Sequence, residues 1–309
     1  MWFKQVQVFR LMDAVRLSIE QAIEKLEPLA FMSCLPSMPF SMGWVSPVDE
    51  DGAPLVRVVN GCIMFCLQIE EKILPAAVIR QELMDKIKQI EAAEGRKVYQ
   101  KQKLSLKDEI TMTLLPRAFS KFTRLYAYID TRNQWLVVGS ANEKKTEQFL
   151  SLFRKSITES VYPFELNKLS PVTTYWLKQQ NYPTSFSIEK SCMLADPDQQ
   201  NRVVRCQQQD LFAHAIQAFI KDGYEVKQLA LCWQDLIKFV LVDNFSLQSV
   251  RFEDQVIAQS NEMEPETRQQ QFDADFLIMT DTLGGLLKDL LQVFVKSAKV
   301  EEKVAIEVA

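Results

Sequence analysis

Hydrophobic and polar residues alternate near the start of the chain, in the stretch FKQVQVFRL at residues 3–11. This alternation is typical of a strand with one buried face. The stretch DAVRLSIEQAIEKL at residues 13–26 then spaces its apolar residues as an amphipathic helix does. Asp13 is the expected N-cap of this helix, because Asp accepts a hydrogen bond from the free N–H groups of a first turn.

Two hairpins are predicted farther along the chain. Asn60 and Gly61 separate two apolar runs, a strong short-range signal for a tight turn. Residues 124–140, RLYAYIDTRNQWLVVGS, predict the second hairpin, and residues 142–157 predict a helix with its charges on one face. Strands joined by short turns and mixed with helices indicate an α+β fold, with mixed, largely antiparallel sheets and flanking helices.

A different pattern lies between the two hairpins. After Pro75, residues 76–94 have helical spacing and end at Gly95, as helices commonly do. A second helix is expected from Ser105, an N-cap with Asp108 three residues later in the manner of a capping box. We therefore expect a protruding helical finger at residues 76–115, inserted into a central domain made of residues 1–75 and 116–170.

A C-terminal α+β domain is expected at residues 171–309, since Pro163 and Pro171 flank a segment of mixed polarity. Its predicted helix covers residues 210–223. Its predicted strands are residues 203–206, 227–233, 235–243, 247–254 and 274–280 (ADFLIMT), followed by a closing helix at residues 283–298.

Composition limits the possible functions. The chain has 309 residues, enough for two domains or for a body with an appendage. Hydrophobic residues make up 47% and charged residues 25%, which is typical of a globular protein. No apolar run approaches the roughly 20 residues that span a bilayer, and the first residues lack the pattern of a signal peptide. We therefore expect a cytoplasmic protein that does not act at a membrane.

Few residues with catalytic or metal-binding chemistry are available. The six cysteines form no Cys-x-x-Cys pair, and we expect reduced and mostly buried thiols. His214 is the single histidine, and its apolar helical context favours a packing role over catalysis. Glycine-rich phosphate-binding motifs are also missing. The sequence therefore predicts no cofactor, no metal and no ATP- or NAD-dependent activity.

Positive charge gathers in one segment, although the formal net charge of the chain is -4. The cations between residues 96 and 124 outnumber the acids by eight to two; they are Arg96, Lys97, Lys101, Lys103, Lys107, Arg117, Lys121 and Arg124. Charge runs are commonly just solvated turns. A positive strip on an acidic protein is also typical of a polyanion-binding surface. Tyr99, Phe119 and Phe122 lie among these cations, and aromatic rings in such places can stack on unpaired bases or pack internally.

A second candidate site is acidic. Asp273 and Asp275 would share one face of a strand, and Asp281 follows them. Paired carboxylates can hold Mg²⁺ for phosphoryl transfer. Such pairs more commonly flank a strand, and no accompanying lysine or glycine loop is present. A Mg²⁺-dependent nuclease is therefore kept only as a third hypothesis.

Several unusual segments resemble the RdgC family of bacterial recombination-associated proteins. They occur from end to end in the family's order: MWFKQVQVFRL at the start, MGWVSP at 42–47, EEKILPAAVI at 70–79, SLKDEITMTLLPRAFSKF at 105–122, LALCWQDLIKFVLVDNFSLQSVRF at 229–252 and QFDADFLIMT at 271–280. The resemblance implies a ring-shaped homodimer, associated with the nucleoid, that encircles DNA without sequence specificity. It implies a preference for double-stranded over single-stranded DNA, restraint of RecA-promoted strand exchange near stalled replication forks, and no catalysis.

The resemblance also implies roles for particular residues. Phe119 would close the ring by contacting a short polar motif of the partner's C-terminal domain, matched here by Gln208, Gln209 and Asp210. The family often has a lysine at the position of Gln208. The missing cation would weaken this contact or its help in binding DNA. The leading hypothesis is thus a non-enzymatic DNA-binding dimer, and the alternative is a regulator that touches RecA directly.

Overall fold

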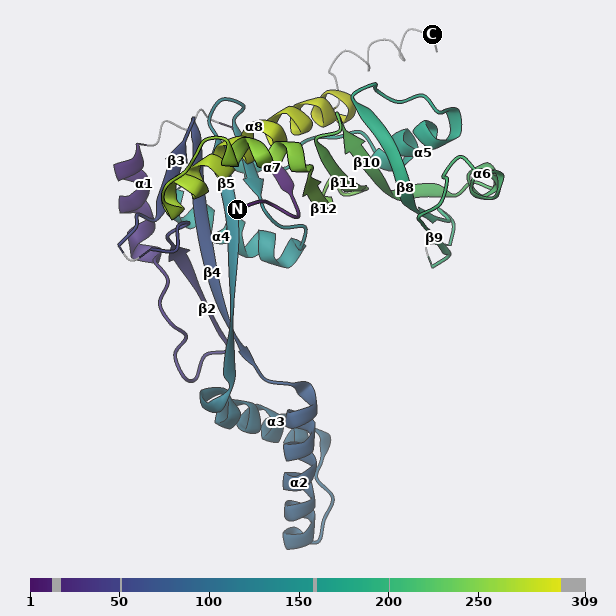
Figure 1. Ribbon diagram of the computed structural model, residues 1–309. Helices are drawn as coiled ribbons and strands as arrows, with labels where there is room; N and C mark the ends of the chain where they lie inside the picture. The colour runs from purple at the N-terminus through teal and green to yellow at the C-terminus, as the bar shows by residue number, and fades with distance from the viewer. Residues whose placement is uncertain (13–17, 51, 158–159, 200, 296–309) are drawn as a thin grey trace, which may run out of the picture.

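The computed structural model describes residues 1–12, 18–50, 52–157, 160–199 and 201–295. In these residues two antiparallel sheets lie side by side, and a helical finger projects from one of them (Figure 1). The α+β class with largely antiparallel sheets and a protruding finger is confirmed. The finger begins where the two longest strands of the first sheet end.

The first sheet has the order β2-β4-β5-β6-β1-β7, with β3 paired to β4 as well. Its strands are β1 Gln7–Leu11, β2 Phe40–Val45, β3 Val56–Val59, β4 Cys62–Ile73, β5 Phe119–Asp130, β6 Trp135–Val138 and β7 Val161–Tyr162. The predicted turn between β3 and β4 is confirmed, because Asn60 and Gly61 have φ values of 48° and 76°. Positive φ at both central residues is what a type I′ hairpin turn requires.

The strands β4 and β5 pair over their full length, from Cys62 opposite Asp130 to Ile73 opposite Phe119. At about 3.3 Å per residue, 12-residue strands span roughly 40 Å. Their lower halves extend beyond β3 and β6, with β2 paired beside β4 as far as Glu71, and they hold the finger away from the body (Figure 1).

Two helices cover one face of the first sheet, α1 Ile19–Leu26 and α4 Glu143–Ile157. Four aromatic rings pack tightly beneath them, with Trp44 against Phe149 at 5.4 Å and Phe65 against Phe153 at 5.7 Å between ring centroids. Ser18 caps α1 in a capping box with Gln21. The expected cap Asp13 lies outside the described residues.

The second sheet has the order β12-β11-β10-β8-β9. Its strands are β8 Phe186–Ala195, β9 Val203–Gln207, β10 Glu225–Trp233, β11 Ile237–Val242 and β12 Leu247–Phe252. Four of these were predicted, and β8 was not. Backbone hydrogen bonds of 2.9 Å in both directions between Val6 and Leu247 join the two sheets. The division into central and C-terminal domains remains a prediction.

The longest helix corrects one prediction. Residues 274–280, expected as a strand, lie inside α8 Arg268–Phe294, which crosses both sheets along the top of Figure 1. Its buried residues recur every three or four positions, as a helix packed on a broad surface requires. Phe276 contacts Tyr128 of the first sheet, and Asp289 accepts a 2.8 Å hydrogen bond from Trp233 of the second.

Other helices complete the second half of the chain. They are α5 Leu169–Gln179, α6 His214–Lys221 and α7 Asp254–Asn261; short 3-10 turns occur at Glu27–Leu29 and Leu115–Arg117. The helix predicted at residues 210–223 is thus shorter, because residues before His214 form a turn. α5 and α7 were not predicted. None of the helices in the described ranges is long and apolar enough to cross a membrane.

Candidate nucleic-acid interface

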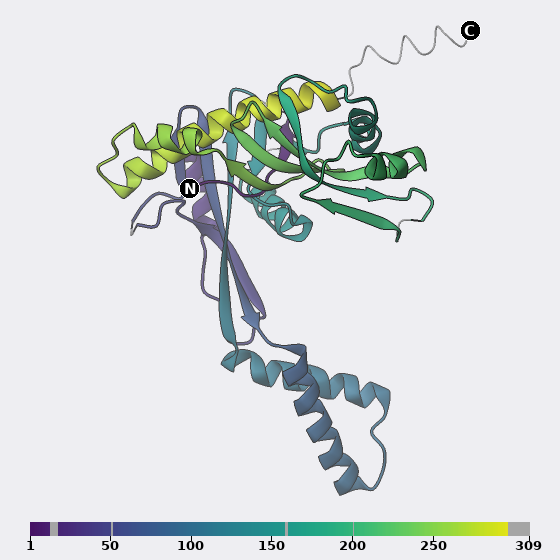
Figure 2. The same cartoon turned by 45° about the vertical axis from the view of Figure 1, so that its right-hand side comes forward.

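The finger consists of α2 Ala76–Glu94 and α3 Gln100–Leu114, which contact each other. α2 reaches farthest from the body, and the turn after it leads back to α3 (Figure 2). None of the residues of α2, all of which are described, is buried. A hairpin with so little buried surface offers most of its side chains to another molecule.

The start of α3 corrects a second prediction. The helix begins at Gln100, after the N-cap Tyr99, so Ser105 lies inside it and is not a cap. Lysine, glutamine and leucine are good helix formers, and they extend the helix back through the basic segment. Lys101 and Lys103 therefore lie on α3 together with Lys107, whereas these two lysines were expected before the start of this helix.

The turn between the two helices is fixed by local contacts. Gly95 ends α2 with φ 63°, a left-handed conformation that favours glycine. Val98 is buried, and its backbone N–H donates a 3.0 Å hydrogen bond to Glu91. Its neighbours Arg96, Lys97 and Tyr99 consequently point into solvent.

Six of the eight predicted cations are free. Within the part of the chain that the structure describes, no ion pair involves Lys97, Lys101, Lys103, Lys107, Arg117 or Lys121. Lys103 and Lys107 are four residues apart and share one face of α3. All six are at least partly exposed, so their charges are available to a polyanion.

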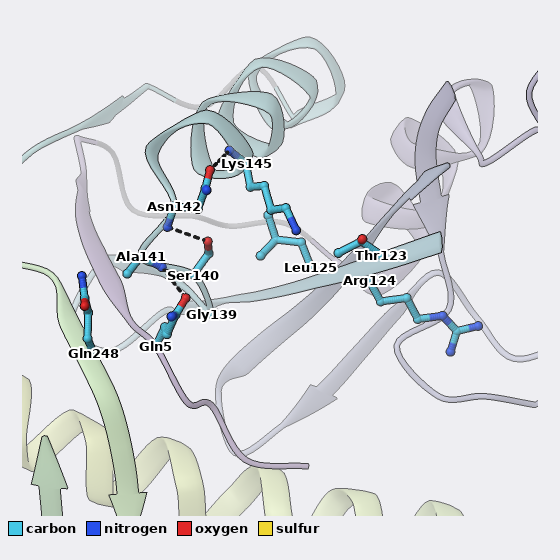
Figure 3. Close-up of a pocket in the computed structure, with 10 residues that line it drawn as sticks. All are labelled: Gln5, Thr123, Arg124, Leu125, Gly139, Ser140, Ala141, Asn142, Lys145 and Gln248. Atoms are coloured by element: carbon cyan, nitrogen blue, oxygen red, sulfur yellow. Dashed lines mark hydrogen bonds between the residues drawn. The ribbon is translucent and has the colours of Figure 1, made fainter. Parts of the chain in front are cut away.

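Arg96 and Arg124 are already engaged. Arg96 pairs with Glu94 at 2.5 Å and lies over the Tyr99 ring, 5.9 Å from its centroid. Arg124 pairs with Asp49 at 2.9 Å, and its guanidinium points away from most of the other residues drawn in Figure 3. An internal carboxylate competes with a phosphate for each guanidinium. We therefore expect Arg96 and Arg124 to contribute less to DNA binding than the other six cations.

The hollow in Figure 3 lies between β5 and the start of α4 and has a volume of about 460 Å³. Gln5 and Ser140 line it and accept hydrogen bonds from the backbone N–H groups of Ala141 and Asn142. Two cations are among the residues that line the hollow, Arg124 and Lys145. The described residues of this lining include no carboxylate, thiol or imidazole. The hollow therefore offers hydrogen bonds and one ammonium group, without a pair for acid–base chemistry.

The three aspartates of the nuclease hypothesis do not form a site. Residues two apart on a helix point about 200° away from each other, so Asp273 and Asp275 do not share a face. Asp273 binds the guanidinium of Arg57, Asp275 binds the terminal amine, and Asp281 pairs with Arg132 at 3.1 Å. No cluster of three metal-binding side chains occurs among the described residues. The prediction that Asp273 and Asp275 share one face of a strand was wrong.

The thiols are mostly buried, as predicted. Cys62, Cys66, Cys192, Cys206 and Cys232 are buried, and Cys34 is partly exposed. Burial raises the pKa of the Cys66 thiol to about 12, which keeps it protonated near neutral pH. His214, predicted to pack, is instead exposed at the first position of α6.

The residues expected to close a ring are separated within one chain. Phe119 is 84% exposed at the base of the finger, opposite Ile73. Gln208, Gln209 and Asp210 follow β9, in the part of the body far from the finger (Figure 1). Gln208 has a strained φ of 53°, and Asp210 accepts a 2.9 Å hydrogen bond from the backbone of Phe212. A contact between these segments would need a second copy and remains a prediction.

Sequence reasoning missed the exposed apolar side chains of the finger. They are Val78, Met84, Leu104 and Met112, each between 43% and 57% exposed. Helical spacing alone does not show which apolar residues of a helix stay exposed. Their exposure follows from the long β4–β5 support, which keeps the finger away from any sheet of its own chain.

Fold and site together define an α+β protein of two antiparallel sheets with a protruding cationic hairpin. Residues 1–297 match the family described as "Putative exonuclease, RdgC". The chain is 39% identical over 294 residues, 94% of this chain and 97% of the relative, to the "Recombination-associated protein RdgC" of Yersinia pestis (strain Pestoides F). A relative of that name from Yersinia enterocolitica (strain NCTC 13174 / 8081) is 38% identical over the same shares. The chain belongs to the RdgC family, as its motifs predicted.

Proposed function

We propose that this chain is a non-catalytic DNA-binding protein that prefers double-stranded DNA, without sequence specificity. The observation that carries the proposal is a set of six cations on and beside the finger that have no ion pair among the described residues, in a chain whose net charge is -4. Lysines and arginines neutralise phosphates and release their counterions, which gives binding that does not depend on base sequence. The acidic remainder of the chain would direct DNA to this surface.

The proposal extends to a homodimer that encircles the duplex, with Phe119 of each copy against the segment Gln208–Asp210 of the other. Encirclement suits nonspecific binding, because the closed ring slows dissociation where base contacts do not. Bound duplex would then be withheld from RecA-promoted strand exchange. In this account the protein acts in the cytoplasm, at the nucleoid, and near replication forks.

A second candidate function is regulation by direct contact with RecA. The exposed apolar residues Val78, Met84, Leu104 and Met112 favour it, because they could meet a protein surface. The two functions differ in what the purified protein does alone. We expect a gel shift of naked duplex DNA with no other protein present. No shift at low salt, together with capture of purified RecA, would favour the second function.

The family description names an exonuclease, so catalysis is tested in the same samples. End-labelled duplex and single strands incubated with the protein and Mg²⁺ should keep their full length. Progressive shortening that EDTA prevents would contradict the non-catalytic part of the proposal and leave the binding part standing.

A further inference from the structure

Tyr99 is exposed on the cationic side of the finger turn. Its side chain is 71% exposed, although the residue before it is buried and the residue after it begins α3. The backbone there is held, since the carbonyl of Tyr99 accepts a 3.0 Å hydrogen bond from the N–H of Lys103. A large ring is thus kept in solvent on a fixed support.

Arg96 holds one side of this ring. Its guanidinium lies 5.9 Å from the ring centroid and is itself fixed by Glu94 at 2.5 Å and Gln102 at 3.3 Å. An arginine over an aromatic ring is a stable arrangement. A ligand that stacks on the rest of the ring would therefore meet a partner whose position is largely set beforehand, which lowers the entropy cost of binding.

The surroundings of the ring favour a nucleotide over an apolar protein segment. Lys97 and Lys101 flank Tyr99 without ion pairs among the described residues, and the first turn of α3 carries no acid. An apolar partner would have to remove water from these ammonium groups without giving them counter-charges. A single DNA strand offers both complements, because a base stacks on the ring while its phosphates meet the lysines.

We propose that Tyr99 is a stacking site for an unpaired DNA base, with Lys97 and Lys101 contacting the adjoining phosphates. This inference rests on the proposed DNA binding and names a further target for it. Bases inside a duplex are already stacked on one another and cannot take this position. The lysines of the finger turn would thus contact the phosphates of either form of DNA, and the Tyr99 ring would add a contact that only single-stranded segments, such as overhangs, can make.

The test compares Tyr99→Leu with Tyr99→Phe on two probes at one salt concentration. One probe is a blunt duplex, and the other is a single strand with 2-aminopurine. Loss of one base–aromatic stack should weaken single-strand binding by Tyr99→Leu about 5- to 100-fold. It should also remove the 2-aminopurine quenching seen on binding. Blunt-duplex affinity should stay within about twofold, and Tyr99→Phe should keep both properties.

Tyr175→Leu is the matched control, because Tyr175 is 50% exposed on the body. This change should leave the affinity for both probes unaltered. Thermal melting and sedimentation of every variant accompany the titrations. An equal loss on both probes, an unchanged single-strand affinity, or a change in oligomeric mass for Tyr99→Leu would overturn the stacking site. If instead the unaltered protein fails to bind the blunt duplex, the proposed function fails and not this inference.

Discussion

Replacing Lys97, Lys101 and Lys103 together by glutamate should weaken duplex binding by roughly 100- to 1,000-fold at about 0.1 M salt. Each lost phosphate contact removes about 0.9 from the salt exponent, or close to one decade of affinity at that concentration. The loss should be the same for unrelated duplex sequences, since phosphates carry no sequence information. Competitive titration on two such duplexes measures it.

Folding should not account for this loss. The three lysines form no ion pair in the described part of the chain, and exposed charges contribute little to stability. Lys101 and Lys103 lie near the N-terminus of α3, where glutamate is favourable for the helix dipole. The matched control is Lys144, Lys168 and Lys288 to glutamate, three exposed lysines of the body that form no ion pair among the described residues. Lys144 and Lys168 also lie at helix N-termini, where glutamate is tolerated. Equal affinities for the finger variant and this control would rule out the finger as the DNA contact.

Phe119→Ala should make the protein leave circular duplex about 30-fold faster while it remains a dimer. The side chain is 84% exposed in one chain, so its removal costs the monomer little stability. An aromatic residue buried at an interface can contribute 2 kcal/mol or more, which corresponds to about that factor. Circular DNA has no end, so release from it requires the ring to open. The dissociation rate and the sedimentation coefficient are the two measurements.

Tyr162→Ala is the control for this change, because Tyr162 is a 52% exposed aromatic residue on β7, away from the finger. It should dissociate as the unaltered protein does. A monomeric Phe119→Ala protein would show that Phe119 holds the whole dimer. A variant unchanged on circular DNA would remove Phe119 from the closing contact.

The elements that sequence predicted correctly carry local signals. Asn60 and Gly61 permit the positive φ of their turn, and Gly95 ends α2 for the same reason. The prediction of a strand in the first part of α8 was wrong because this helix covers two sheets and buries a broad face. A broad apolar face blurs the helical period, and residues 274–280 then resemble a buried strand. Ser105 and Asp108 form a capping-box spacing that also occurs inside helices, so the spacing alone could not place the start of α3.

The basic character of the site was visible in the sequence, but the availability of each charge was not. Glu94 is only two residues from Arg96, yet the amino-acid sequence alone does not show that the two side chains pair. Asp49 is 75 residues from Arg124, and only the folded sheet brings them together. The exposure of Tyr99 similarly depends on Val98, which takes the inward position at the turn.

The central claim is that unpaired cations hold DNA through its phosphates, and the salt dependence of duplex affinity tests it most directly. Each chain contributes Lys97, Lys101, Lys103, Lys107, Arg117 and Lys121, and a ring meets only about one helical turn of DNA. If roughly 5 to 8 phosphates are neutralised, log K should fall against log salt concentration with a slope of about -4 to -7. Two unrelated duplexes should give nearly the same slope and affinity. A slope near zero, or a sequence preference above about a hundredfold, would contradict the claim.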